Sequence, residues 1–214
     1  MRPAPGHSEP LTGRRADIAW RHHDFEDRAR PVKIVVAGPF SAGKTTLITT
    51  ISEVAVLSTE RKVTDHTGTG KTHTTVALDF GRITFDNGAS IHIFGTPGQR
   101  RFEDVWGAVA DGMVGLVLLV HAGDERSATE ARSILDAFKR YADVPYCVGV
   151  THLDRVGHPP AIVIEKVRAG LGIDTSVPVV TCDPRRREDV KALLLQILVA
   201  VQARLDEAQH GRRL

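Results

Sequence analysis

The chain has 214 residues, a length that suits one α/β domain with a sizeable core rather than two domains. Its 28 Lys and Arg residues nearly balance 26 Asp and Glu residues, and the formal net charge of +2 argues against nucleic acid as the main partner. The two cysteines, Cys147 and Cys182, form neither a disulfide framework nor a metal-ligand pattern, which fits a reducing cytosol.

Residues 1–30 are rich in Pro, Arg, His and Asp and show little apolar periodicity, so we expect a flexible N-terminal extension. Trp20 and Phe25 support an alternative, in which a short part of this segment is anchored on the domain or on a partner. The folded domain is expected over residues 31–207, and residues 208–214 are expected to form a flexible C-terminal tail.

A regular alternation of apolar segments follows from Pro31 onward. It predicts strands at 32–37, 75–84, 90–95, 113–120, 145–150 and 177–181, and helices at 44–56, 100–111, 127–141, 160–171 and 187–207. The turn at residues 85–89 contains Asn87-Gly88, a hairpin signal that makes the second and third strands antiparallel. The predicted fold class is α/β, with three layers: a six-stranded, mostly parallel sheet with one antiparallel edge strand, and helices on both faces.

Residues 38–45, Gly-Pro-Phe-Ser-Ala-Gly-Lys-Thr, form a complete phosphate-binding loop motif. A strand precedes it and a helix follows, so successive backbone N–H groups and the helix N-terminus point at one anion. That anion is expected to be a nucleoside triphosphate, with Lys44 at its β- and γ-phosphates and the Thr45 hydroxyl on Mg²⁺. The predicted nucleotide contacts in this segment are Phe40, Ser41, Ala42, Gly43, Lys44, Thr45 and Thr46.

A polar, glycine-containing segment at residues 64–75 leads into the strand Val76-Ala77-Leu78-Asp79-Phe80-Gly81. This arrangement resembles the small Ras-like GTPases, whose first switch ends in a threonine followed by such a strand. The resemblance implies a Ras-like P-loop NTPase fold, and it implies that Thr75 meets Mg²⁺ and the γ-phosphate only in the triphosphate state. Thr74 is the neighbouring alternative, and a threonine-rich loop without this role is the other.

The segment Phe94-Gly95-Thr96-Pro97-Gly98-Gln99 resembles the Asp-x-x-Gly-Gln segment of the same family. The resemblance implies that Gly98 donates its N–H to the γ-phosphate and that Gln99 orients the attacking water. Together with Lys44, these two residues form the predicted catalytic set.

Two positions depart from the family pattern. Gly95 stands where most relatives carry an aspartate that binds Mg²⁺ through water, and Asp79 and Asp124 are the candidate replacements. Phe40 stands where many relatives carry glycine, and its bulk would crowd either Gln99 or an incoming arginine finger. We therefore expect slow unassisted hydrolysis.

The segment Val148-Gly149-Val150-Thr151-His152-Leu153-Asp154 lies at the C-terminal end of a buried strand, where open α/β sheets bind ligands. It resembles the family's Asn-Lys-x-Asp base-reading motif, of which only Asp154 is unchanged. Its carboxylate would accept hydrogen bonds from N1–H and the 2-amino group of guanine, two donors that adenine lacks. Thr151 replaces the Asn and loses an amide, whereas His152 replaces the Lys and offers an imidazole that can stack on the base.

At the end of the next strand, Cys182 and Asp183 fall where the family has Ser-Ala-Lys, and their backbone is expected to support guanine O6. We interpret Cys182 as a small loop residue rather than a redox nucleophile. The run Arg185-Arg186-Arg187 is interpreted as the solvated start of a helix, with partner binding as the alternative.

The resemblance covers about residues 31–206 and is greatest to bacterial small GTPases related to the gliding-polarity switches, above all those of the actinobacterial conservon operons. It implies GTP or GDP and Mg²⁺ as ligands, slow hydrolysis of GTP in a molecular switch, and a roadblock-type protein as partner. It further implies a signalling complex that includes a sensor-kinase-like membrane protein. Two other classes stay open: a module that holds GTP or GDP without useful hydrolysis, and an ATP-using P-loop kinase or ATPase.

The sequence gives no sign of direct membrane insertion. A signal peptide, a myristoylation glycine and a prenylation cysteine are not recognisable at either end. The longest apolar stretch, residues 113–120, is too short to span a bilayer. We therefore expect a cytoplasmic protein that a partner can recruit to a membrane.

Overall fold

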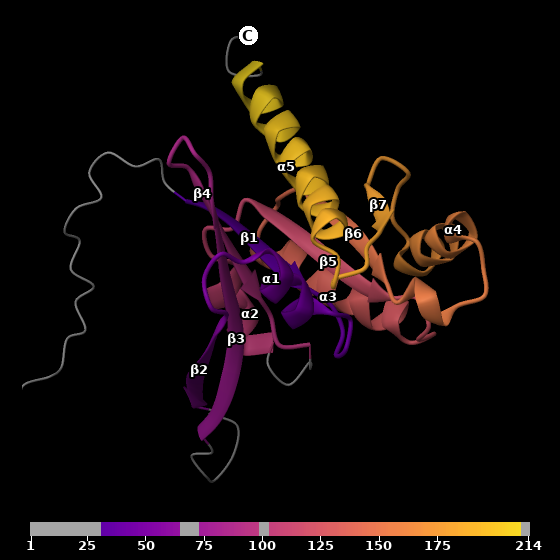
Figure 1. The fold of residues 1–214 in the computed structure, drawn as a ribbon, viewed down its shortest axis with the longest axis horizontal. Helices are drawn as coiled ribbons and strands as arrows, with labels where there is room; N and C mark the ends of the chain where they lie inside the picture. Colours follow the sequence, from indigo (N-terminus) through magenta and orange to yellow (C-terminus); the bar gives the residue numbers. More distant parts are fainter. Residues whose placement is uncertain (1–30, 65–72, 99–102, 211–214) are drawn as a thin grey trace, which may run out of the picture.

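The computed structural model describes residues 31–64, 73–98 and 103–210, so the predicted N-terminal extension lies outside the described residues. Seven strands form one sheet, with helices between most of them along the chain (Figure 1). The elements are β1 (Val32–Ala37), α1 (Lys44–Ile51), β2 (Leu57–Thr64), β3 (His73–Thr84), β4 (Ser90–Gly95), α2 (Glu103–Ala110), β5 (Gly115–His121), α3 (Ser127–Tyr141), β6 (Tyr146–Thr151), the short 3₁₀ helix η2 (Leu153–Arg155), α4 (Pro160–Leu171), β7 (Val179–Thr181) and α5 (Arg187–His210). None of these helices has the length and apolar character needed to cross a membrane.

The strand order of the sheet is β2-β3-β4-β1-β5-β6-β7. The five strands β4, β1, β5, β6 and β7 pair in parallel in this order. β3 is antiparallel to both of its neighbours, β2 and β4. The turn between β3 and β4 is the predicted hairpin, in which the Phe85 N–H donates to the Ala89 carbonyl at 2.9 Å and Gly88 has a φ of +82°. The predicted α/β fold with helices on both faces of the sheet is thus confirmed.

The sheet has one strand more than the six that the sequence predicts. β2 pairs with β3 along its whole length, from Leu57 opposite Phe80 to Thr64 opposite His73. The segment Leu-Ser-Thr-Glu-Arg-Lys-Val-Thr has no alternation of apolar and polar residues, so its sequence carries no strand signal. Backbone pairing with β3 accounts for its conformation. As a result β2, rather than the antiparallel strand β3, forms this edge of the sheet.

Two apolar layers hold the helices on the sheet. On one face α2, α3 and α4 pack through side chains that include Trp106, Phe138 and Leu171. On the other face α1 and α5 pack through side chains that include Ile48 and Ile197. β5 lies between these layers and is buried along its whole length, as its uninterrupted apolar run predicts. The layers fix the strand ends, and with them the loops that carry the predicted site.

Two helices end at other residues than the sequence predicts. α1 stops at Ile51 rather than at residue 56, because Ser52 takes an extended conformation and its hydroxyl donates to the Val54 carbonyl at 2.8 Å. α5 continues to His210, so residues 208–210 belong to the helix rather than to a flexible tail. The last turns of α5 extend beyond the sheet (Figure 1), and Leu205 on them is exposed.

Candidate nucleotide site

The phosphate-binding loop runs from the end of β1 to the start of α1. Ser41 and Gly43 in this loop both have positive φ angles, 59° and 96°. Such left-handed conformations turn the chain sharply, and Gly43 adopts its conformation without steric cost. The Gly43 carbonyl then accepts the first bond of the helix, from Leu47 N–H at 2.9 Å. The loop therefore delivers the backbone into the N-terminus of a helix, the arrangement that binds phosphate.

Lys44, the first residue of α1, is buried against this loop. Its Nζ donates hydrogen bonds to the carbonyl oxygens of Gly38 at 2.8 Å and Pro39 at 2.6 Å. Burial lowers the pKa of Lys44 to about 8, and the nearby Asp79 carboxylate acts in the opposite direction. An ammonium group fixed in this position is suited to the β- and γ-phosphates of a nucleotide.

The segment after β4 closes directly on the phosphate-binding loop. A Cβ atom at Gly98 would lie 2.6 Å from the backbone nitrogen of Phe40 and 2.7 Å from Nζ of Lys44. A side chain at position 98 would therefore force the loop backbone to move, and glycine lets the two segments touch. The Phe40 side chain points outward and is 70% exposed. Gln99 is the next residue along the chain and lies outside the described residues.

Asp79 on β3 lies beside the place that a side chain at position 95 would take. The two residues face each other in the pairing of β3 with β4, and a Cβ atom at Gly95 would lie 3.3 Å from Oδ2 of Asp79. The same Oδ2 accepts a hydrogen bond from the Thr45 hydroxyl at 2.5 Å. Asp124, the other candidate, accepts a hydrogen bond from the backbone N–H of Arg126 in the loop after β5. Of the two carboxylates, Asp79 is therefore the one that meets the phosphate-binding loop.

Thr45 and Asp79 together offer hard oxygen donors at the start of α1. Mg²⁺ prefers such donors and is usually bound by one or two protein oxygens together with phosphate oxygens and water. In the part of the chain that the structure describes, no group of three or more His, Cys, Asp or Glu side chains could hold a metal by itself. The donor set thus fits Mg²⁺ that binds together with a nucleotide.

Thr151 and His152 lie at the end of β6, on the side of the site where the base is predicted to bind. Thr151 is fully buried, and its hydroxyl lies 3.0 Å from the Ala42 carbonyl and 3.2 Å from the Val120 carbonyl. It braces the phosphate-binding loop from beneath. Nδ1 of His152 lies 2.9 Å from the same hydroxyl, and its ring stacks on His121 with 3.9 Å between the ring centroids and 8° between the planes. Nothing in the sequence singles out His121, because its role depends on the pairing of β5 with β6.

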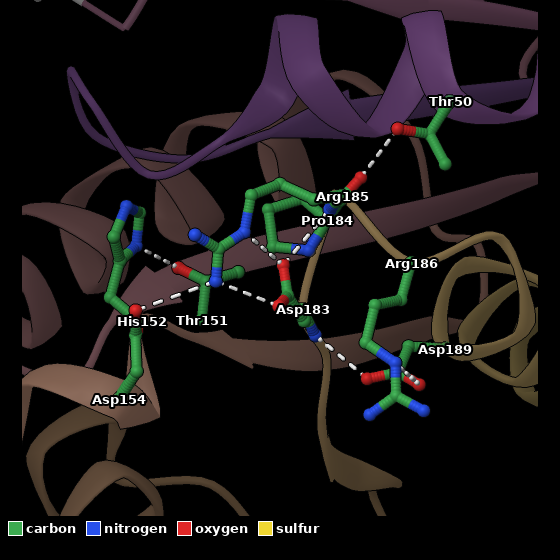
Figure 2. A network of polar contacts seen from close by, with 9 residues as sticks. All are labelled: Thr50, Thr151, His152, Asp154, Asp183, Pro184, Arg185, Arg186 and Asp189. Atoms are coloured by element: carbon green, nitrogen blue, oxygen red, sulfur yellow. Dashed lines mark hydrogen bonds and ion pairs between the residues drawn. The ribbon is translucent and has the colours of Figure 1, made fainter.

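Figure 2 shows a polar network in which Arg185 joins the carboxylates of Asp154 and Asp183. Arg185 donates to Asp183 from Nε and from Nη2, each at 2.8 Å, which makes a bidentate ion pair. This pairing lowers the pKa of Asp183 to about 2. Nη2 of Arg185 also lies 3.4 Å from Oδ2 of Asp154. α5 begins at Arg187, as predicted, and Arg185 lies in the loop just before it.

The loop between β7 and α5 also touches the phosphate side of the site. The Pro184 carbonyl accepts a hydrogen bond from the Thr50 hydroxyl of α1 at 2.7 Å (Figure 2). A Cβ atom at Gly43 would lie 2.9 Å from Cγ of Pro184. The base and phosphate sides of the candidate site are therefore in direct contact through this loop.

Both cysteines are buried, Cys147 on β6 and Cys182 just after β7. Burial raises the pKa of each thiol to about 12, so neither is a thiolate at neutral pH. This supports the interpretation of Cys182 as a small loop residue.

Most of the predicted site residues therefore converge where the central strands end. Thr75 lies in β3, opposite Lys62 of β2, and this strand begins at His73, two residues before the predicted start. Thr46 is exposed on the first turn of α1. Asp79, Arg185 and Pro184 complete the arrangement, and the sequence names only the first of them as a candidate.

This fold and this loop define a P-loop nucleotide-binding protein. A family model described as "Conserved hypothetical ATP binding protein" matches residues 36–204, and the chain belongs to that family.

Curated relatives are similar over part of their own length. Translation initiation factor IF-2 of Clostridium perfringens is 28% identical over 189 residues, which are 86% of this chain and 26% of the factor. The same factor of Prosthecochloris aestuarii is 30% identical over 152 residues, 70% of this chain and 14% of the factor. An uncharacterized protein of Methanocaldococcus jannaschii is 39% identical over 72 residues, 34% of this chain and 39% of that protein. The chain thus spans about a quarter or less of the initiation factors it matches.

Proposed function

We propose that the protein binds GTP with Mg²⁺, hydrolyses GTP slowly to GDP and acts as a molecular switch. The observation that carries this proposal is the contact of Gly98 with the phosphate-binding loop beside Lys44. A segment packed so closely against the loop has to yield when a γ-phosphate binds there, and it can close again after hydrolysis. A difference of this kind between two nucleotide states is what a switch needs.

In the proposed reaction, Lys44 neutralises charge on the β- and γ-phosphates, and the Gly98 N–H donates to a γ-phosphate oxygen. Gln99 orients the water that attacks the γ-phosphorus, after which the bond to the β-phosphate oxygen breaks and GDP is left. The Mg²⁺ supplies further neutralisation of the phosphates when it is bound. Its proposed protein ligands are the Thr45 and Thr75 hydroxyls.

Guanine is the proposed base because Asp154 lies in η2, just after β6, and its carboxylate is part of the polar network that Figure 2 shows. A carboxylate accepts from the N1–H and 2-amino donors of guanine and meets no such donors on adenine. His152 supports the proposal because its flat ring lies near Asp154 and could stack on a base. One face of that ring is already covered by His121. The proposed contacts of the remaining residues of the phosphate-binding loop are through its backbone.

The resemblance to gliding-polarity and conservon GTPases supports a further part of the proposal. We infer that a roadblock-type protein binds the switch and brings it to a signalling complex at a membrane. A second candidate function is that of an ATP-using P-loop enzyme, because the family to which the chain belongs is described as ATP binding.

The two candidates differ in the base they bind. We expect mant-GTP to bind the full chain at least tenfold more tightly than mant-ATP in the presence of Mg²⁺, roughly the discrimination of one well-placed polar contact. Lys44→Ala should abolish binding of both nucleotides and serves as the control for the site. Equal or tighter binding of mant-ATP would reject the GTP switch in favour of the ATP-using enzyme.

Hydrolysis needs a separate measurement. Single-turnover reactions with excess Mg²⁺ should release phosphate slowly from GTP, and Gln99→Leu should slow this release further while mant-GTP affinity stays unchanged. The proposed roadblock-type partner is then added to the same reaction. GTP binding without phosphate release under either condition would leave a nucleotide-binding module without useful hydrolysis.

A further inference from the structure

The loop after β7 has no backbone donor to offer to a base. The Cys182 N–H donates to the Val150 carbonyl at 2.9 Å, and the Asp183 N–H donates to Oδ2 of Asp189 at 3.0 Å. Pro184 has no N–H, and the Arg185 N–H donates to Oδ1 of Asp183 at 3.0 Å. The sequence predicts that this backbone supports guanine O6, but its donors are already engaged.

The Thr151 side chain at the end of β6 offers no donor for O6 either. Thr151 replaces the asparagine of the resembled motif, and its hydroxyl is fully buried against the carbonyls of Ala42 and Val120. A hydroxyl has a single hydrogen to donate, and at Thr151 that hydrogen is directed into the protein. A site that reads guanine through Asp154 would therefore lack a partner for the neighbouring O6, which costs specificity.

Arg185 has the missing donors in the right neighbourhood. Its guanidinium is fixed by the bidentate pair with Asp183, and Asp183 is itself held by α5 through Asp189. Nη2 lies 3.4 Å from Oδ2 of Asp154 (Figure 2). Arginine has five N–H donors, and within the described residues Nη1 makes no hydrogen bond to the protein. Two N–H donors are thus available beside the base-reading carboxylate.

We propose that Arg185 is a base-reading residue, which donates to O6 of guanine while Asp154 accepts from N1–H and the 2-amino group. This inference rests on the proposed function. A donor and an acceptor side by side match the neighbouring O6 and N1–H of guanine, and arginine is the side chain that most often reads guanine O6. Adenine carries an amino donor at position 6 and an acceptor at N1, so both contacts would be mismatched.

The pairing with Asp183 makes this role efficient. Arginine loses much rotamer freedom when it is immobilised, and here an internal carboxylate immobilises it before any nucleotide arrives. When Asp154 leaves Arg185 to bind the base, the guanidinium stays in place, because its two shorter hydrogen bonds, both 2.8 Å, are to Asp183. Asp183 is therefore a positioning residue for Arg185.

The test compares three nucleotides on the full chain: mant-GTP, mant-ATP and 2-aminopurine riboside triphosphate, which keeps the 2-amino group but lacks O6 and the N1–H. Arg185→Ala should weaken mant-GTP binding about tenfold, within the range expected for one base-reading contact, and should leave the other two nucleotides unchanged. Arg185→Lys should recover only part of the loss, because a lysine does not keep the bidentate pair with Asp183. Arg204→Ala is the control, since Arg204 on α5 pairs with Asp143, outside this network, and should retain wild-type binding of all three nucleotides.

The outcomes separate this inference from the function on which it rests. A uniform loss for all three nucleotides in Arg185→Ala would make Arg185 a purely structural residue, and tighter mant-GTP binding would make it a competitor for Asp154. Either result overturns the inference while the wild-type preference for GTP stands. A wild-type protein that prefers ATP would instead overturn the proposed function itself.

Discussion

Asp79 on β3 lies directly opposite Gly95 on β4, and Oδ2 of its carboxylate lies 3.3 Å from the place that a Cβ atom at position 95 would take. The negative charge that the family pattern places on β4 is therefore available from the neighbouring strand. Since Oδ2 of Asp79 accepts from the Thr45 hydroxyl, this charge stays beside the first turn of α1. The carboxylate that is absent from position 95 in the sequence is thus supplied by β3 instead of β4 in the structure.

Asp79→Asn should weaken the affinity of the GTP-bound protein for Mg²⁺ by about 10–100-fold, the usual cost of losing a carboxylate that orients a metal ligand. The measurement is the Mg²⁺ concentration needed to slow mant-GTP release. The exchanged variant, with Asp79→Gly and Gly95→Asp together, should recover part of the effect. Asp124→Asn is the control and should behave like the wild type, and an equal effect of both single variants would contradict the assignment.

Gly98→Ala should slow GTP hydrolysis about tenfold or more while GDP still binds, because the new methyl group meets backbone atoms of Phe40 and Pro39 within 2.7 Å. In the triphosphate state the methyl group would hinder the Gly98 N–H from reaching the γ-phosphate beside Lys44. Single-turnover hydrolysis and mant-GDP titration measure the two effects separately. Gly157→Ala adds a methyl group where no atom lies within 4 Å and should change neither. A Gly98→Ala variant with wild-type hydrolysis would show that close approach is not required.

The sequence predicts the phosphate side of the site better than the base side. Lys44 and Gly43 belong to one contiguous motif, so local chemistry determines their geometry. Asp79 meets Gly95 only through the register of β3 with β4, and a single sequence does not reveal that register. The sequence can name Asp79 as a candidate but cannot choose it over Asp124.

Long-range contacts explain the other differences from the sequence predictions. β2 forms because β3 offers an edge for pairing, although its own residues do not alternate. In the sequence Arg185 is not distinguishable from the two arginines that follow it. The loop geometry brings it to Asp154, 31 residues away in the chain. His121 and His152 become a stacked pair only when β5 and β6 lie side by side.

His152 should make the protein less stable in mild acid. Burial, His121, Arg155 and Arg185 lower its pKa from 6.5, against the opposing effect of Asp154, so the folded protein favours the neutral ring. The unfolded chain therefore binds more protons below about pH 6.5, and stability is present above that pH and lost as the pH falls. The fall in Tm between about pH 7.5 and about pH 5.5 should be smaller in His152→Asn, since asparagine tolerates the positive φ of 58° and does not titrate. Equal falls in Tm for the wild type and the variant would show that His152 does not cause the loss of stability in acid.

Phe40→Gly should hydrolyse GTP faster than the wild type, by about tenfold, if the exposed ring crowds the catalytic glutamine or an arginine finger in the triphosphate state. The expectation rests on the size of a side chain at the lip of the phosphate-binding loop. Single-turnover hydrolysis by the folded variant is the measurement, with mant-GTP affinity as the check on the loop. Phe85→Gly changes another exposed phenylalanine, in the turn after β3, and should leave the rate unchanged. Unchanged or slower turnover in Phe40→Gly would count against crowding.

Lys44→Met should stabilise the fold while it abolishes nucleotide binding. The pKa of Lys44 falls from 10.5 to about 8 mainly through burial, which corresponds to a cost of about 3 kcal/mol for holding the charged form. Methionine fills similar space without a charge, but the carbonyls of Gly38 and Pro39 lose their donor, so the net gain expected is about 1–2 kcal/mol. Thermal unfolding without nucleotide should show a Tm higher by about 3 °C for each kcal/mol. Lys166→Met, on the exposed side of α4, should leave the Tm nearly unchanged. A lower Tm for Lys44→Met would mean that the two carbonyl contacts outweigh the cost of burying the ammonium group.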